Sequence, residues 1–543
     1  MTEYELWLQQ DLDVEIRDEL LAVKDSPAEI EDRFFKALSF GTGGLRGVIG
    51  AGTNRMNRYT VGKATFGLGD YLLSAYPNAP ISVVIAYDSR RKSQFFAKTA
   101  AEVLSSQGIT AYLFSELTPT PVLSYAVRAL KAQAGIVITA SHNPKEYNGY
   151  KVYNEHGCQL TDDAANSVTE RIEKFGYFTA YAPDESKIHI LNDDIMHAFL
   201  KEIRKCSLSE IDPNCVPSIV YTPLHGTGMR YVREILSQIG ATEVHVVAEQ
   251  EEPDENFTTC PYPNPEEKAA LALALRDAEL YNADLVLATD PDADRVGIAV
   301  KDESGNFCLL NGNETGSLLL YYILSRKKET GTLGANPTVI KTIVTSDLIH
   351  AIAKDYGANV MDVLTGFKYI GEGMDTLDNY VLGLEESYGY LVGKHARDKD
   401  AVSAVMLIVE ACAYFKSQGK SLYQVLQYLY KTYGYYRTEL ISMSLPGKDG
   451  MQKMADIINA IRKNPKFEFG GENFAFTDFQ YGDTGLPKSN VLRFLSENYR
   501  VIIRPSGTEP KLKIYFQVNA KEEEKAISVT AELKNYVTNV LLK

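Results

Sequence analysis

The sequence predicts an α/β protein built from three similar units with mixed, largely parallel sheets, followed by a C-terminal α+β domain. Helix-like and strand-like segments alternate along each of the three units, and this alternation is typical of parallel sheets covered by helices. The last part of the chain instead combines long strand-like runs with one closing helix. We therefore expect four domains, at residues 1–207, 208–322, 323–436 and 437–543.

Length and composition are consistent with this division and exclude several classes of partner. The chain has 543 residues, of which 45% are hydrophobic and 23% charged, so several globular domains can each bury a core. A net charge of −15 argues against nucleic acid as the main partner. We find no apolar segment long enough for a membrane span and no secretory signal at the acidic start. The six scattered cysteines have no metal-binding spacing, so we expect reduced thiols in a cytoplasmic protein. The sequence does not indicate an oligomeric state.

The first forty residues are predicted to be helical, with a capping box and a first-turn proline at Ser26-Pro27-Ala28-Glu29. A glycine-rich turn, GTGGLRG, follows and carries Arg46. Its spacing is not that of a dinucleotide-binding loop. The turn is therefore either a flexible connector or a backbone that lets Arg46 approach an anion closely.

The first unit contains the most informative loop. We expect its helices and strands at 60–75, 81–86, 93–107, 109–114 and 136–138. The last strand leads into a polar turn that carries Ser141 and His142, and a rigid strand of this kind is suited to holding a nucleophile. Ser141 lacks the flanking glycines of a hydrolase elbow, so it must be activated or modified in another way. His142 alone would more often be a structural histidine.

The next two units repeat the alternation. Their expected strands lie at 218–221, 243–248, 284–289, 338–344, 358–363 and 380–384, with helices at 228–239 and 266–280 in the first of the two. Ligand sites in such sheets lie beyond the carboxyl ends of the strands. A polar motif stands at this position in each unit, at Ser141, Asp290 and Glu385.

The segment TDPDADR is a candidate metal site. Asp290, Asp292 and Asp294 alternate, so in an extended turn their carboxylates can converge. Crowded carboxylates repel one another unless a hard cation neutralises them, and oxygen ligands favour magnesium. An EF-hand is excluded because Arg295 and Lys301 occupy the positions of its glycine and glutamate. A solvated acidic turn is the remaining alternative.

The third unit carries a candidate sugar-binding motif. Glu385 and Ser387 stand two residues apart directly after a strand, and a carboxylate beside a hydroxyl suits the vicinal hydroxyls of a sugar. A turn with a helix cap at Ser387 is the alternative. The nearby segment RDKD, with Lys399, could be merely an exposed charge cluster.

The C-terminal domain contains a candidate phosphate loop. The segment RPSGT, which starts at Arg504, lies between strand-like runs at 499–503 and 513–518. Its arginine, hydroxyls and backbone amides could bind phosphate, and Lys513 adds positive charge. A plain β-turn is the alternative.

Five segments together resemble the α-D-phosphohexomutase family, which includes phosphoglucomutases and phosphomannomutases. They occur in the family's order across nearly the whole chain: GTGGLRG (41–47), TASHNPKEYNGYK (139–151), DPDADR (290–295), LEESYG (384–389) and RPSGTEPK (504–511). The resemblance implies four domains around a central cleft and a serine that is phosphorylated in the resting enzyme.

The resemblance also assigns roles to residues. It implies metal binding by Ser141, Asp290, Asp292 and Asp294. It implies catalysis by Ser141, His142, Lys151, Arg46 and Lys399, without deciding which group is the acid or base. It implies substrate binding by Arg295, Thr365, Gly366, Glu385, Ser387, Arg504, Ser506, Gly507, Thr508 and Lys513.

The implied activity is the interconversion of glucose 1-phosphate and glucose 6-phosphate through a phosphoserine enzyme and a glucose 1,6-bisphosphate intermediate. Magnesium is the implied cofactor, the sugar bisphosphate the activator, and small sugar phosphates the partners. Leu384 and Ala401 depart from the hexose-specific pattern and, together with the segment TGFKYIG (365–371), resemble the branch of bacterial phosphoglucomutases, phosphopentomutases and glucose 1,6-bisphosphate synthases. Lys513 replaces an arginine that is frequent beside the phosphate loop of the family. The alternatives are therefore a phosphopentomutase acting on ribose or deoxyribose phosphates, or a phosphomannomutase. More distant alternatives are a serine phosphatase and a non-catalytic sugar-phosphate-binding protein.

Overall fold

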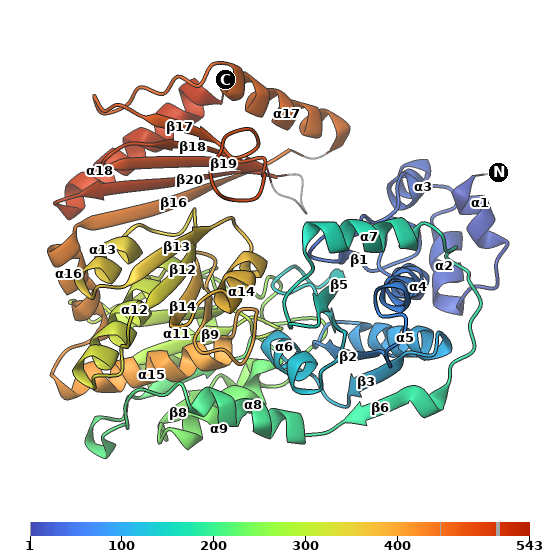
Figure 1. The fold of residues 1–543 in the computed structure, drawn as a ribbon, viewed down its shortest axis with the longest axis horizontal. Coiled ribbons are helices and arrows are strands. Elements are labelled where there is room, and N and C mark those ends of the chain that lie inside the picture. Colours follow the sequence, from blue (N-terminus) through green and yellow to red (C-terminus); the bar gives the residue numbers. More distant parts are fainter. Residues whose placement is uncertain (1, 446, 506–510, 543) are drawn as a thin grey trace.

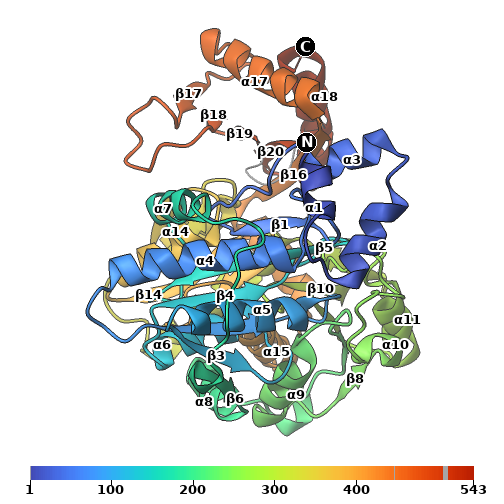
Figure 2. The same ribbon diagram turned by 90° about the vertical axis from the view of Figure 1, so that its right-hand side faces the viewer.

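The computed structural model describes residues 2–445, 447–505 and 511–542. Its first three units form the body of the molecule, and the C-terminal unit stands above them in both views (Figure 1, Figure 2). This is the predicted arrangement of three α/β units and an α+β domain.

The three α/β units share one sheet plan. In each, the chain forms three parallel strands and then an antiparallel fourth strand. These four strands lie side by side in the same order in every unit: second, first, third, fourth. The loop between the third and the fourth strand therefore lies at the same place in every unit. These loops carry the serine, the aspartates and Ser387, with Glu385 ending the third strand of its own unit.

The first unit is a sheet with helices on both faces. Val83 and Ile85 of its central strand face one hydrophobic core, while Val84 and Ala86 face another, as the alternation of a strand requires. Its strands are β1 (Leu45–Val48), β2 (Ser82–Tyr87), β3 (Thr110–Phe114), β4 (Ala134–Ile138), β5 (Tyr147–Asn154) and β6 (Ile188–Leu191). Its helices are α4 (Arg58–Ala75), α5 (Ser93–Ser106), α6 (Thr120–Ala129) and α7 (Asp162–Ile172).

The second and third units follow the same pattern. The second contains α8 (Asp194–Arg204), β7 (Ile219–Thr222), α9 (Gly228–Gln238), β8 (Val244–Val246), α10 (Ala248–Glu251), α11 (Ala272–Leu280), β9 (Leu285–Thr289), β10 (Val296–Lys301) and β11 (Phe307–Leu310). The third contains α12 (Gly312–Glu329), β12 (Thr338–Thr342), α13 (Leu348–Asp355), β13 (Asn359–Val363), α14 (Phe367–Asp375), β14 (Tyr380–Glu385), β15 (Gly389–Leu391), α15 (Ala401–Ser417) and α16 (Leu422–Tyr433).

The C-terminal unit is an antiparallel sheet in the order β16-β20-β19-β18-β17. Its elements are β16 (Tyr435–Ser444), α17 (Gly447–Lys463), β17 (Ala475–Asp478), β18 (Leu492–Leu495), β19 (Tyr499–Pro505), β20 (Lys511–Ala520), α18 (Glu523–Tyr536) and a π-helical turn (Val537–Leu541). One continuous core joins the first three units, whereas this unit has a core of its own.

The chain begins with the predicted helices α1 (Glu3–Leu8), α2 (Val14–Ala22) and α3 (Pro27–Phe34). Trp7 of α1 is fully buried among aromatic rings and fixes these helices to the first unit. The expected capping box at Ser26 is wrong, because its side chain makes no cap hydrogen bond. Glu29 instead forms an ion pair with Arg33, one helical turn further on.

Other boundaries differ from the sequence prediction. Arg46 lies in the edge strand β1, directly after the glycine-rich turn and not in it. The strand expected at 243–248 ends at Val246, because α10 starts at Ala248. The helix expected at 266–280 begins only at Ala272. Among the helices of the described ranges, none combines the length and apolarity that crossing a bilayer requires.

Candidate active site

Ser141 lies at the carboxyl end of β4, in the loop between the third and fourth strands of the first unit. Its side chain is buried, and its hydroxyl donates a hydrogen bond to Asp290 Oδ2 at 2.9 Å. The same oxygen lies 3.2 Å from His142 Nδ1. Its backbone is left-handed, with φ of +51°, and its amide donates to Thr139 Oγ1 at 2.8 Å. A strained, hydrogen-bonded backbone thus aims the hydroxyl at the second unit.

Arg90 is a positioning residue that the sequence reasoning missed. It lies in the loop after β2, and its guanidinium is fully buried. Both of its terminal nitrogens donate to the serine loop, at the carbonyl oxygens of Ser141, Asn143, Pro144 and Tyr147. One rigid side chain therefore fixes the path of the loop from the serine to the start of β5.

A second set of contacts holds Arg90 itself. Its Nε lies 3.3 Å from Asp88 Oδ2 in a pair that is inaccessible to solvent, and Phe257 of the second unit stacks on its guanidinium. Asp88 also accepts a hydrogen bond from Ser93 Oγ at 2.6 Å. The signal in the sequence was the polar segment YDSRR directly after a buried strand, which is the position where such sheets carry functional groups.

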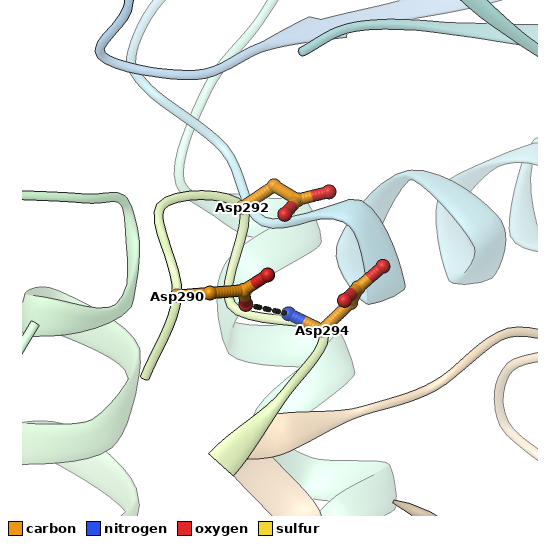
Figure 3. Close-up of side chains that lie close together, drawn as sticks. All are labelled: Asp290, Asp292 and Asp294. Atoms are coloured by element: carbon orange, nitrogen blue, oxygen red, sulfur yellow. Dashed lines mark hydrogen bonds between the residues drawn. The ribbon is translucent and has the colours of Figure 1, made fainter. Parts of the chain in front are cut away.

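Asp290, Asp292 and Asp294 form the predicted cluster of carboxylates in the loop after β9 (Figure 3). One oxygen from each lies within 4.8 Å of the others, and all three side chains are buried. Asp290 Oδ1 accepts hydrogen bonds from the amides of Asp294 and Arg295. Within the described chain, Asp292 Oδ1 and Asp294 Oδ1 accept none. Buried carboxylate oxygens without donors fit a divalent cation, and burial excludes the solvated-turn alternative.

The pKa values of these acids reflect the crowding. Burial, with the charges of its two neighbours, raises the pKa of Asp290 well above its usual range. Burial and Asp292 likewise raise the pKa of Asp294. Burial also disfavours the charge on Asp292, but Lys151 outweighs this effect and lowers its pKa. The loop thus holds more negative charge than its protein surroundings compensate.

Two lysines from different units neutralise part of the negative charge of the three aspartates. Lys151 of β5 binds Asp292 at 2.7 Å and lies 3.5 Å from Asp294. Lys399 lies 3.3 Å from Asp294 and 3.0 Å from Asp398. Burial lowers the pKa of both lysines, but the neighbouring acids raise it further, so both remain charged. The RDKD segment is therefore a buried part of the site and not an exposed charge cluster.

A second loop of the second unit, residues 224–227, packs against the loop that carries the three aspartates, and the sequence reasoning missed it too. Leu224 and His225 both have positive φ, at 47° and 60°. Gly226 follows, and a Cβ there would lie 2.4 Å from Pro291 Cα, so only glycine fits. Thr227 then donates its amide to Pro291 O at 2.8 Å. Strained backbone on one loop thus fixes the other.

The predicted sugar-binding residues lie together in the third unit. The carboxylate of Glu385 is buried, accepts the amide of Gly366 at 3.0 Å, and has a pKa that burial raises to about 7. Thr365 Oγ1 is buried and, among the described residues, has no hydrogen-bond partner. Ser387 is partly exposed and not a helix cap. Arg295 extends from the metal loop to Glu266 at 3.0 Å.

Arg504 and Lys513 face each other across β19 and β20. Lys513 is close enough to oppose the rise that burial causes in the pKa of Glu266. Directly opposite residues of an antiparallel pair lie on the same face of the sheet, so Arg504 shares with Lys513 the face that approaches Glu266 of the second unit. Ser506, Gly507 and Thr508 lie outside the described residues, so the proposed phosphate loop between these strands stays a prediction.

Arg46 and His142 complete the predicted residues. Arg46 Nη1 donates to Asn143 Oδ1 at 3.1 Å, so the edge strand carries it to the serine loop. Burial, together with Arg295 and Arg46, lowers the pKa of His142 well below its usual value. His142 is therefore neutral at physiological pH.

This fold and this site define an enzyme of the phosphosugar mutase class, an isomerase with a serine opposite a cluster of acids. The chain belongs to the phosphoglucomutase/phosphomannomutase family. The family's α/β/α domains I, II and III match residues 37–177, 197–305 and 311–433, and its C-terminal domain matches residues 440–532.

Curated relatives support this assignment over almost the full length. A phosphoglucomutase of Staphylococcus epidermidis is 37% identical over 532 residues, covering 93% of this chain and 96% of that protein. A phosphoglucomutase of Staphylococcus aureus is 37% identical over 542 residues, covering 95% and 96%. The predictions of family, fold class and phosphosugar mutase chemistry are confirmed.

Solved structures share the fold. The Paramecium phosphoglucomutase pp63/parafusin, in an open form, superposes with a TM-score of 0.73 at 17% identity, covering 93% of this chain and 95% of that one. A family member from Burkholderia thailandensis gives 0.69 at 17% identity, covering 92% and 96%.

Proposed function

We propose that this enzyme interconverts glucose 1-phosphate and glucose 6-phosphate, with Ser141 as the residue that carries the phosphoryl group. One observation carries the proposal: the Ser141 hydroxyl lies 2.9 Å from Asp290, inside a buried cluster of three acids and two lysines. Phosphoryl transfer requires a fixed oxygen acceptor and neutralised charge on the moving group, and this site supplies both. The relatives named phosphoglucomutase favour glucose over a pentose or mannose.

Magnesium fits the acid cluster. Asp290, Asp292 and Asp294 would hold it, together with the oxygen on Ser141, because their buried oxygens include two without hydrogen-bond donors. When bound, the ion supplies positive charge that stabilises the transferring phosphoryl group. Lys151 and Lys399 supply further positive charge, which the surrounding acids keep in place.

We assign to His142 the role of general base and general acid at the Ser141 oxygen. Its ring is neutral and its Nδ1 lies 3.2 Å from the serine oxygen. It takes the proton of the Ser141 hydroxyl when that oxygen receives a phosphoryl group and passes this proton to the sugar oxygen that the group leaves. In the reverse transfer it takes the proton of the attacking sugar hydroxyl and gives it to the serine oxygen. Lys151 and Lys399 remain charged throughout and do not exchange this proton.

The far side of the site would hold the sugar and the phosphate that does not react. Glu385, Ser387 and the 365–366 loop would bind sugar hydroxyls; the unpartnered Thr365 hydroxyl and the Glu385 carboxylate beside Gly366 support this role. Arg504 and Lys513, with the segment 506–508, would bind the second phosphate. A glucose 1,6-bisphosphate intermediate that reorients between these two sides presents either phosphate to Ser141.

A substrate panel tests the proposal. Purified enzyme is assayed with magnesium and catalytic glucose 1,6-bisphosphate on glucose 1-phosphate, mannose 1-phosphate and deoxyribose 1-phosphate. We expect the highest kcat/KM on glucose 1-phosphate, and intact mass spectrometry should show one phosphoryl group that disappears in Ser141→Ala. Higher efficiency on deoxyribose 1-phosphate would indicate a phosphopentomutase. Release of inorganic phosphate without isomerisation would indicate a phosphatase.

A further inference from the structure

Cys206 lies beside two polar residues, His395 and Asp400, that have no role in the proposed mutase reaction. It lies in the second unit, between α8 and β7, and its side chain is partly exposed. His395 and Asp400 belong to the segment that carries Lys399, and both are buried. Among the described residues, none of these three forms a hydrogen bond or an ion pair with the three clustered aspartates.

The histidine is oriented by the aspartate on one side and faces the cysteine on the other. His395 Nε2 lies 2.8 Å from Asp400 Oδ2, and the side chains of both are almost fully buried. Within the described chain, His395 Nδ1 has no hydrogen-bond partner. The position of a Cβ on Gly393 would be 3.2 Å from this nitrogen and 2.5 Å from Cys206 Sγ, so both atoms crowd the same small space.

We propose that Cys206 is a reactive thiol, activated by His395 and Asp400. Its oxidation by a peroxide displaces the segment that carries Lys399 and inhibits the enzyme. A thiol beside an imidazole that a carboxylate orients is the arrangement that generates a thiolate nucleophile. The proposal goes beyond the mutase reaction, which uses none of these three groups.

The charge state of the histidine supports this geometry. Burial lowers the pKa of His395, but Asp400 and Cys206 outweigh burial and raise it to about 9. The ring is therefore charged at neutral pH, and a positive charge close to the sulfur is typical of the surroundings of reactive cysteines. Cys308 offers a contrast within the same chain, because it is also partly exposed, yet burial raises the pKa of its thiol to about 11.

The chemical step balances without any further reactant. The Cys206 thiol gives its proton to solvent. The thiolate sulfur then attacks one oxygen of hydrogen peroxide, so that an S–O bond forms while the O–O bond breaks. Sulfur loses two electrons and becomes a sulfenic acid. The leaving hydroxide takes a proton from the charged His395 ring and departs as water, and the ring regains a proton from solvent.

The added oxygen has little room. Cys206 Sγ already lies 3.8 Å from the carbonyl oxygen of Val392 and against Gly393. Arg128 holds the next turn of the chain through the carbonyl oxygens of Lys394 and His395. A larger sulfur group therefore pushes on a segment that is fixed at its far side, and the displacement reaches Lys399, which pairs with Asp294 at 3.3 Å.

The first experiment needs no variant. The full-length enzyme is treated with hydrogen peroxide in the presence of a dimedone-type probe, and the labelling of each cysteine is followed by peptide mass spectrometry alongside mutase activity. We expect Cys206 to be labelled at least tenfold faster than Cys308, with activity falling at the same rate. In a parallel sample oxidised without the probe, activity should return after treatment with dithiothreitol. Equal labelling of the two cysteines, or full activity with Cys206 fully labelled, would overturn the proposal.

Two variants sharpen the test. Cys206→Ser should keep the starting activity and resist peroxide, whereas inactivation at the wild-type rate would contradict the proposal. His395→Asn should slow the labelling of Cys206 about tenfold and leave that of Cys308 unchanged. If His395→Asn does not fold, the comparison of the two cysteines in the wild-type enzyme still decides. The labelling rates do not depend on which sugar the enzyme uses, so failure here is distinguishable from failure of the proposed function.

Discussion

The two sides of the active site are built in opposite ways. On the transfer side, Ser141, Asp292 and Lys151 are buried and held by direct contacts between units that share one hydrophobic core. On the sugar side, Ser387 and Arg504 are partly exposed, and the C-terminal unit that supplies Arg504 has its own core. The proposed reaction would require this difference, because a site dense in charge must be fixed and dry, whereas a site that admits and reorients a bisphosphate must open.

The contact between the third and fourth units is correspondingly polar at one edge. Asp347 binds Arg500 at 2.6 Å and Gln517 at 2.8 Å, beside a small hydrophobic cluster. Polar contacts of this kind can rearrange at lower cost than a continuous core. Changes on the transfer side should therefore reduce kcat, and changes on the sugar side should mainly raise KM.

The largest expected effect compares two serines in equivalent loops. Ser141→Ala removes the oxygen that we propose carries the phosphoryl group, so we expect kcat to fall about 10⁴-fold or more. Ser387→Ala removes a hydroxyl that we propose contacts the sugar, so we expect KM to rise about tenfold. Steady-state kinetics on glucose 1-phosphate distinguishes the two results. An active Ser141→Ala enzyme would contradict the proposed mechanism.

The second-largest expected effect concerns Arg90, which holds the serine loop through four carbonyl groups. Arg90→Lys keeps the charge but loses the fork that contacts four carbonyl groups, so we expect kcat/KM to fall about 10²-fold. Arg91→Lys changes the exposed neighbour and is the matched control, with activity expected within about twofold of wild type. Equal activity of both variants would show that the loop holds its shape without Arg90.

The pH dependence of KM tests the sugar side. Glu385 is mostly protonated at pH 6 and mostly ionised at pH 8, because burial raises its pKa to about 7. Under the proposed function its carboxylate would accept hydrogen bonds from sugar hydroxyls, so we expect KM to fall about fivefold over this range. Glu385→Gln should flatten the profile. A pH-dependent kcat with a constant KM would instead place the titrating group on the transfer side.

The same shift has a consequence for stability. The pKa of Glu385 is 4.5 in the unfolded chain and about 7 in the folded protein. Between these two pH values the folded state therefore binds a proton that the unfolded state has lost. Its contribution to stability is therefore complete below pH 4.5 and is lost as the pH rises through 7.

The smallest expected effect is on thermal stability. Asp290→Asn removes one of three crowded carboxylates and keeps an oxygen that can accept the amide hydrogen bonds, so we expect the Tm of the metal-free enzyme to rise by about 2 °C. Magnesium should raise the Tm of the wild type and not that of the variant. Glu303→Gln, at an exposed turn, is the control. A lower Tm for Asp290→Asn would show that Asp290 is favourable without a cation.

Much of this design could be predicted from local sequence. Strand and helix periodicity predicted three α/β units, and each functional motif follows a buried strand, as with Ser141 after β4 and Asp290 after β9. The boundaries that failed, such as the helix beginning at Ala272 and not at 266, depend on tertiary packing and not on periodicity.

The sequence by itself determined the chemical groups, because hydroxyls, carboxylates and glycine turns are local properties of the chain. Only the tertiary structure decided their partners: Ser141 meets Asp290 across 149 residues, and Arg90 reaches the serine loop across 51. Those contacts form because three units bury one continuous core, which sets the relative positions of their strand ends to within a hydrogen-bond length. No pattern in a single segment encodes that distance, so the clamp at Arg90 and the pair of Cys206 with His395 became visible only in the folded chain.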